Sequence, residues 1–248
     1  MGLSDDYRRQ FAWRSWEAVL DALPSVADQT VLDLGCGIGD QAAELVARGA
    51  YVIGIDANEE LLQEARSRRL ANAEFRTADL RALADPGMPV DGLWCSFTAA
   101  YFPDVTGMLA SWGKHLRSGS WVSLTKIDDL FGHRPLSARA KSLLDDYAHS
   151  ALTSGRYDFH MGRRLASHLE QSGHSILKVM TIEDRELSFR GPAQREVVEA
   201  WRRRFDRMGV LRDFCGPEFE QVREEFLHCL TRADHWSDAK VYSCLAVK

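Results

Sequence analysis

The most constraining feature of the sequence is an apolar run that leads directly into three glycines. Residues 31–40 read Val-Leu-Asp-Leu-Gly-Cys-Gly-Ile-Gly-Asp, and a helical pattern follows at 41–48. Glycine permits a sharp turn and lets a ligand approach the backbone closely, because it has no Cβ. In open α/β sheets, ligands bind at the carboxyl ends of the strands. The segment therefore predicts a strand, a ligand-binding loop and a helix, in that order.

The alternation of strand and helix continues along the first half of the chain. Further strands are expected at 51–55, 73–76, 92–96 and 120–126, a spacing that produces parallel βαβ units and a doubly wound sheet. The rhythm then changes. One amphipathic helix is expected before the core, at 5–22. After the core, helices are expected at 135–154, 161–172, 192–208 and 217–231, and strands at 176–189 and 240–247.

Composition excludes several classes of protein. The 248 residues suffice for one domain with additions, and a net charge of −5 argues against non-specific nucleic-acid binding. We find no apolar run long enough to span a bilayer and no secretory signal, so we expect a cytoplasmic protein without a membrane partner. The five cysteines are expected to stay reduced, and the lack of a CxxC pair argues against a disulfide framework and a structural zinc site.

The glycine spacing favours one kind of ligand over another. The dinucleotide fingerprint is GxGxxG, whereas this chain has GxGxG, with Asp33 two residues before it. An acidic residue here suits a ligand with a positive centre better than a pyrophosphate. A tight turn with no ligand role is the simpler alternative, and a nicotinamide dehydrogenase stays possible from the fold class.

Residues 30–127 resemble the S-adenosylmethionine-binding core of class I methyltransferases. The resemblance implies a seven-stranded, mostly parallel, Rossmann-like sheet with helical insertions after strands five and six. It also implies one methyltransferase domain over 1–248, with the cofactor core at 28–127 and a helical substrate cap at 128–172 and 192–231. S-adenosyl-L-methionine would be the cofactor and S-adenosyl-L-homocysteine the product.

The resemblance assigns residues to the cofactor. Asp56 follows the second strand, at the position where the family's acidic residue holds both ribose hydroxyls. Asp79 follows the third strand, at the position where the family's residue accepts a hydrogen bond from the adenine amino group. Asp56 could instead only begin a helix, Asp79 could be a turn residue, and Cys36 could be a small packing residue. The complete cofactor-binding set is Asp33, Gly35, Cys36, Gly37, Gly39, Asp56, Ala57, Asp79, Leu80, Ser96 and Phe97.

The sequence at the end of the fourth strand excludes several classes of methyl acceptor. It reads Cys-Ser-Phe-Thr at 95–98, unlike the Asn/Asp-Pro-Pro-Tyr/Phe motif of enzymes that methylate amino groups of bases or glutamine. The paired-glutamate loop of protein arginine methyltransferases is also missing. Asp128 and Asp129 resemble half of the magnesium site of catechol-type enzymes, but no carboxylate follows strand four, so no metal is expected. A small-molecule methyltransferase remains.

Candidate acceptor-site residues leave the fourth and fifth strands or open a later helix. The catalytic candidates are His133, Asp128 and Tyr101, with His133 the first choice for a base if the nucleophile carries a proton. The substrate-binding candidates are Tyr101, His160 and Arg163. We expect residues 128–163 to line a closed, mostly apolar pocket. The alternative is that His133 and His160 are loop residues bonded to backbone.

The arginine run at 202–207 could indicate nucleic-acid binding, but the helical spacing of the neighbouring apolar residues argues against it. Val197, Trp201 and Phe205 fall on one stripe, so the arginines are expected on a solvated face, paired in part with Glu196 and Glu199.

The sequence thus predicts methyl transfer to a small-molecule acceptor, without nucleic acid. The alternatives are methylation of a protein or RNA side chain and a non-catalytic S-adenosylmethionine-binding regulatory protein. The acceptor, the methylated atom and the oligomeric state stay open.

Overall fold

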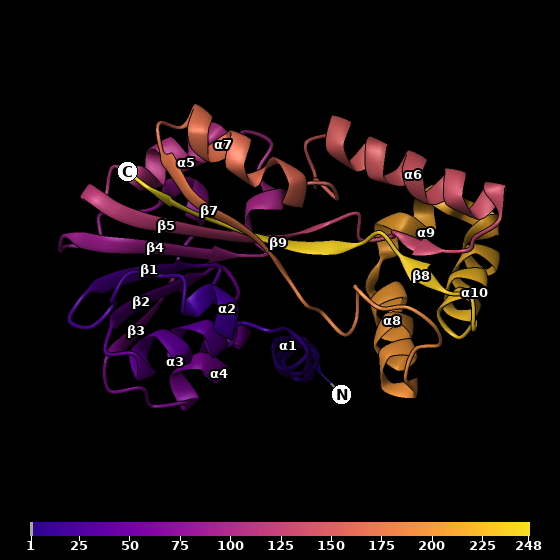
Figure 1. The fold of residues 1–248 in the computed structure, drawn as a ribbon, viewed down its shortest axis with the longest axis horizontal. Helices are drawn as coiled ribbons and strands as arrows, with labels where there is room; N and C mark the ends of the chain where they lie inside the picture. The colour runs from indigo at the N-terminus through magenta and orange to yellow at the C-terminus, as the bar shows by residue number, and fades with distance from the viewer. Residues whose placement is uncertain (1) are drawn as a thin grey trace.

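The protein is built on a seven-stranded sheet, seen in a computed structural model that describes residues 2–248 (Figure 1). The strands follow the order β3-β2-β1-β4-β5-β9-β7. Strands β1 to β5 pair in parallel, and β9 runs antiparallel to both of its neighbours. This confirms the predicted fold class. The strand bounds are β1 Thr30–Leu34, β2 Tyr51–Asp56, β3 Ala73–Thr77, β4 Val90–Ser96, β5 Leu116–Asp128, β7 Ser175–Ile182 and β9 Lys240–Val247.

Helices cover both faces of the sheet, which explains why its central strands are apolar throughout. Helices α2 (Glu17–Leu20), α3 (Asp40–Ala47) and α4 (Glu59–Ser67) lie on one face, and α5 (Val105–Gly113) and α7 (Leu165–Gln171) lie on the other (Figure 1). Four of the five residues of β1 are buried, as expected for a strand covered on both sides. As predicted, Asn58 begins α4, and its side chain accepts hydrogen bonds from the Glu60 and Leu61 amides.

The additions gather beyond one end of the sheet (Figure 1). They comprise α6 (Ala138–Thr153), α8 (Arg195–Arg207), α9 (Gly209–Cys215) and α10 (Phe219–Leu230), with a short pair of strands, β6 (His133–Arg134) and β8 (Trp236–Ser237). Four short 3-10 turns complete the order: η1 Leu80–Ala82, η2 Ala99–Tyr101, η3 Gly162–Arg164 and η4 Gly216–Glu218. The predicted stripe of Val197, Trp201 and Phe205 is buried. The insertions therefore follow the fifth and sixth sheet strands, as expected.

The single helix expected at 5–22 is wrong, because two helices, α1 (Leu3–Ala12) and α2, share this stretch. Between them the chain makes backbone hydrogen bonds with the segment after β7: the Ser15 amide donates to the Glu183 carbonyl and the Arg185 amide to the Trp13 carbonyl. The same contacts divert the chain after Ile182, so the strand expected to reach residue 189 ends there. The helix expected at 217–231 begins after Gly216, a residue with φ of 54° that separates it from α9.

Among residues 2–248, no helix has the length and apolar character needed to cross a membrane.

Candidate cofactor and acceptor site

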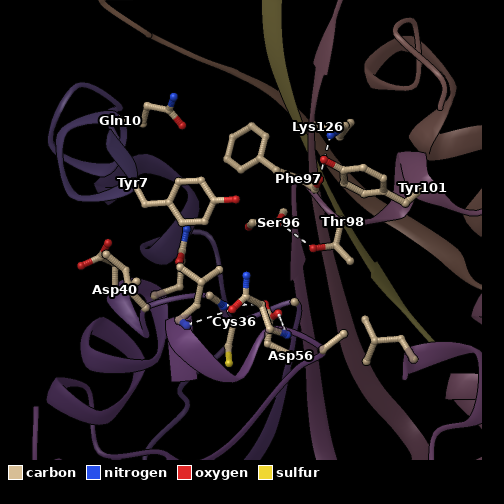
Figure 2. A pocket seen from close by; sticks show the side chains of 18 of the residues that line it. Tyr7, Gln10, Cys36, Asp40, Asp56, Ser96, Phe97, Thr98, Tyr101 and Lys126 are labelled. Carbon is tan, nitrogen blue, oxygen red and sulfur yellow. Dashed lines mark hydrogen bonds between the residues drawn. The ribbon is translucent and has the colours of Figure 1, made fainter. Parts of the chain in front are cut away.

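A cavity of about 580 Å³ opens at the carboxyl ends of β1, β2, β4 and β5 (Figure 2). Figure 2 shows Cys36, Asp40 and Asp56 on one side of it and Phe97, Tyr101 and Lys126 on the other. The edge of the sheet is the one that the sequence predicted. Of the predicted residues, those that line the cavity are Gly35, Cys36, Gly37, Asp56, Ala57, Asp79, Leu80, Ser96, Phe97 and Tyr101.

The glycine loop is fixed by the end of β2. Gly35, Gly37 and Gly39 all have positive φ, and a Cβ on Gly35 would lie 1.9 Å from Oγ1 of Thr98. The Gly35 amide donates to the Ile55 carbonyl at 2.7 Å. Asp56 then holds the loop through one carboxylate oxygen, which accepts from the Gly37 amide at 2.9 Å, while the other accepts from the Asn58 amide at 2.9 Å. Each oxygen keeps a further lone pair for a ligand hydroxyl.

Two of the predicted cofactor residues do not line the cavity. Asp33 is buried behind the loop; burial, and then the neighbouring Asp56 carboxylate, raise its pKa to about 8. One of its oxygens has no hydrogen-bond partner among the described residues. A Cβ on Gly39 would meet Phe75 and Ala65, so this glycine serves the packing of β3 and α4 against the loop. Neither residue therefore lines the cavity, and both belong to the structure that supports the glycine loop.

Asp79 lies at the expected place after β3 and already has a partner. Its carboxylate accepts from the Arg81 amide at 2.9 Å and from the Arg81 guanidinium, which lowers the pKa of Asp79. Both residues are exposed on the cavity rim, so this ion pair can rearrange at little cost.

The opposite end of the cavity is formed by the ends of β4 and β5. Phe97 has φ of 60°, a strained value for an aromatic residue, and its carbonyl accepts a hydrogen bond from Nζ of Lys126 at 2.7 Å. The same Nζ donates to the Tyr157 hydroxyl at 2.6 Å. Burial lowers the pKa of Lys126 to about 7. Sequence reasoning missed this residue, although a lysine near the end of an apolar strand was a usable signal.

The roof of the cavity comes mainly from α1, and this corrects the expectation for residues 128–163. Only Tyr157 of that stretch lines the cavity, whereas Leu3, Tyr7, Gln10 and Phe11 of α1 all do. Figure 2 shows the Tyr7 ring pointing into the space between the glycine loop and Phe97. Two more residues that sequence reasoning missed, Arg14 and Arg204, complete this side.

The remaining predicted acceptor residues lie elsewhere. His133 is fully buried among Phe189, Trp201 and Phe226, and its Nδ1 lies 3.0 Å from Nε2 of His235. Burial, aided by His235, lowers the pKa of His133. A buried histidine in an aromatic cluster cannot reach an acceptor in the cavity, so the predicted base is corrected.

Asp128, Arg163 and His160 also fall outside the lining. Asp128 accepts from the Arg163 amide at 3.1 Å and from its Nε at 2.9 Å, which ties β5 to η3. His160 donates its backbone amide to Asp158. These three residues shape the turn after β5 and do not contact the cavity, contrary to the roles predicted for them.

The arginine run is less solvated than predicted. Arg203 and Arg207 pair with the buried Asp6 of α1, and Arg204 pairs with the buried Glu186. Glu199 pairs with Arg195 and Glu196 pairs with Arg185, both outside the run, instead of with the arginines of the run as predicted. The run therefore joins α8 to α1 and places one arginine at the cavity.

Part of the chain is similar to a known protein family. The family described as "Methyltransferase domain" matches residues 31–119. Trans-aconitate 2-methyltransferase of Azoarcus sp. (strain BH72) is 37% identical over 113 residues, 45% of this chain and 44% of that protein. The chain thus aligns with less than half the length of this relative.

Two solved structures share the fold over nearly the whole chain. One is the [4+2]-cyclase SpnF, with a TM-score of 0.61 at 18% identity, covering 94% of this chain and 79% of that one. The other is an S-adenosylmethionine-dependent methyltransferase from Mesorhizobium loti, with a TM-score of 0.53 at 20% identity, covering 92% of this chain and 96% of that one. Residues 31–119 thus match a methyltransferase domain, and nearly the whole chain shares the fold of these two structures. In this domain the residues 31–119 supply the glycine loop, Asp56, Asp79 and the end of β4.

Proposed function

We propose that this protein is an enzyme that transfers a methyl group from S-adenosylmethionine to a small molecule. The observation that carries the proposal is a single cavity with two chemically different ends. The glycine loop, Asp56 and Asp79 form one end, and Phe97, Tyr101 and Lys126 form the other. A nucleoside and an acceptor can therefore bind side by side.

The cofactor end fits a nucleoside. Asp56 would hold ribose hydroxyls with the free lone pairs of its two oxygens, and Asp79 with Leu80 would border the adenine. The hydroxyl of Ser96 is buried at the cavity and has no partner among residues 2–248, so it is free to bind the amino-acid part. When bound, S-adenosylmethionine supplies a methyl group activated by a sulfonium.

The remaining residues position the acceptor and exclude water. Helix α1 covers the cavity with Tyr7 and Phe11, and a covered site strengthens every electrostatic contact inside it. A volume of about 580 Å³ lies within the usual range for small-molecule sites. The Azoarcus relative bears the name of a small polycarboxylate as its substrate, which supports an acceptor of this size.

A non-catalytic, S-adenosylmethionine-binding role is the second candidate, because a shared fold does not fix the activity: the same fold also serves a cyclase, which catalyses a different reaction. Calorimetric titration with S-adenosylhomocysteine and with NAD tests the cofactor, and transfer of labelled methyl from S-adenosylmethionine to a metabolite panel tests the enzyme. Binding of NAD in place of S-adenosylhomocysteine would refute the proposal. Cofactor binding with no transfer across the panel would favour the binding protein.

A further inference from the structure

Three cationic side chains line the acceptor end of the cavity: Arg14, Lys126 and Arg204. All three are drawn from different parts of the chain, between α1 and α2, from β5 and from α8. Cations that gather in a cavity repel one another, so their charges have to be balanced by protein carboxylates or by a ligand.

The two arginines are balanced within the protein. Nε of Arg14 lies 2.7 Å from Asp184, and Arg204 lies 2.5 Å from Glu186. Both carboxylates are buried, with 1% of each side chain exposed. These pairs hold the two guanidinium groups in fixed positions beside the cavity, and the Arg14 guanidinium lies 4.3 Å from the centre of the Phe97 ring.

Lys126 is not balanced in this way. It is 2% exposed, and its Nζ donates to two neutral oxygens, the Phe97 carbonyl and the Tyr157 hydroxyl. No carboxylate in the described part of the chain forms an ion pair with it. Its third N–H remains for a ligand. The groups that act on its charge from a distance include Cys95, Arg14, Arg204 and Asp158, and the Asp158 carboxylate is already paired with Arg164.

Resting on the proposed function, we propose that the methyl acceptor is a carboxylate-bearing molecule whose carboxylate binds Nζ of Lys126, flanked by Arg14 and Arg204. One uncompensated cation matches the single charge of a carboxylate, whereas a doubly charged phosphate would exceed it. The rings of Phe97, Tyr101 and Tyr157 surround Nζ at 4.6–5.7 Å, so the body of the acceptor faces aromatic surfaces. Such surfaces favour a planar, unsaturated molecule.

Pairs of probes that differ only in charge test this assignment. The protein is saturated with S-adenosylhomocysteine and titrated calorimetrically with the planar monocarboxylates trans-cinnamate, benzoate and sorbate, and with the primary amide of each. At least one carboxylate should bind about tenfold or more tightly than its amide. If no carboxylate in the panel binds, or if the amides bind as well, the proposal is wrong.

Variants assign the preference to Lys126. Lys126→Met should abolish the preference for carboxylate, while Lys141→Met, at an exposed position on α6, should preserve it. A Lys126→Met protein that keeps the preference would overturn the proposal. The affinity for S-adenosylhomocysteine is measured for the wild type and for every variant. If the wild type does not bind S-adenosylhomocysteine, the proposed function itself has failed, and not only the assignment of Lys126.

Proton uptake provides a readout that needs no variant. Burial holds the pKa of Lys126 at about 7, so near pH 8 most of the free protein carries the neutral amine. An adjacent carboxylate raises that pKa, so binding should take up a proton near pH 8 and much less near pH 6. Titration in two buffers with different ionisation enthalpies measures this uptake. Carboxylate binding without uptake near pH 8 would contradict the placement at Lys126.

Discussion

At the scale of single residues, two aspartates near the glycine loop show how position divides similar side chains between roles. Asp56 lines the cavity and uses both oxygens to fix backbone amides. Asp33 lies behind the loop, buried, with one unpartnered oxygen. The first is therefore expected to govern ligand affinity and the second to govern how stability depends on pH.

Asp56→Ala should weaken S-adenosylhomocysteine binding by about 1.5–3 kcal/mol, the range for hydrogen bonds to a charged group. Calorimetry measures the affinity, and circular dichroism checks that the fold survives the loss of the two amide contacts. An unchanged dissociation constant would show that the ribose is held by other residues.

Asp33→Asn should raise the melting temperature of the cofactor-free protein near pH 8 and change it little near pH 4. The pKa of Asp33 is about 8 in the folded protein, well above its unfolded value, so the folded state retains a proton that the unfolded state has released. The wild type therefore loses stability as pH rises from about 4 to 8, and asparagine removes that loss.

Thermal unfolding at both pH values provides the measurement, with Asp21→Asn at an exposed position as the control. An equal difference in melting temperature at pH 4 and pH 8 would rule out a raised pKa for Asp33.

At the scale of elements, α1 is held over the cavity mainly by charge. Asp6 is 3% exposed and accepts from Arg203 at 3.0 Å and from Arg207 at 2.7 Å, both from α8. On the other side, Arg8 of α1 pairs with Glu64 of α4. The helix thus spans from the C-terminal additions to the sheet core, and its position decides whether the cavity is covered.

Asp6→Ala should lower the free energy of unfolding by about 1.5–3 kcal/mol and weaken S-adenosylhomocysteine binding, because Tyr7 and Phe11 would lose their fixed position. Denaturant unfolding and calorimetry measure the two effects. The matched control is Asp5→Ala, an adjacent exposed carboxylate that does not pair with α8. If Asp6→Ala binds S-adenosylhomocysteine as tightly as the wild type, the anchoring of α1 to α8 does not contribute to the cofactor site.

At the scale of the whole molecule, the cavity draws on segments from residue 3 to residue 204. A ligand bound there contacts the sheet core, α1 and α8 together, so it should stabilise the folded state as one unit. The antiparallel strand β9, inserted between β5 and β7, joins the end of the chain to the same sheet.

S-adenosylhomocysteine at a hundredfold excess over its dissociation constant should therefore stabilise the fold by about 2.7 kcal/mol. For a domain of this size the melting temperature should rise by about 5–10 °C. Differential scanning calorimetry measures the shift, with NAD at equal concentration as the control. A shift with NAD alone would contradict the assigned cofactor.

Local sequence determined the sheet and the cofactor end of the cavity. The glycine loop, the Asn58 cap and Asp56 each act over a few residues, so their spacing along the chain carries their geometry. The buried stripe of α8 was predictable for the same reason, since helical periodicity places Val197, Trp201 and Phe205 on one side.

Tertiary structure alone decided the acceptor end. Arg14 is held at the cavity by Asp184 and Arg204 by Glu186, and the first of these contacts joins residues 170 positions apart in the sequence. The sequence offered His133 as the first candidate for a base, but its packing against Trp201 and His235 keeps it away from the cavity. The lowered pKa of Lys126 comes from its burial, which depends on the packing of the whole chain around β5. Periodicity records which face of an element is apolar, but not which distant charges that face will meet, and those charges determine what the cavity can bind.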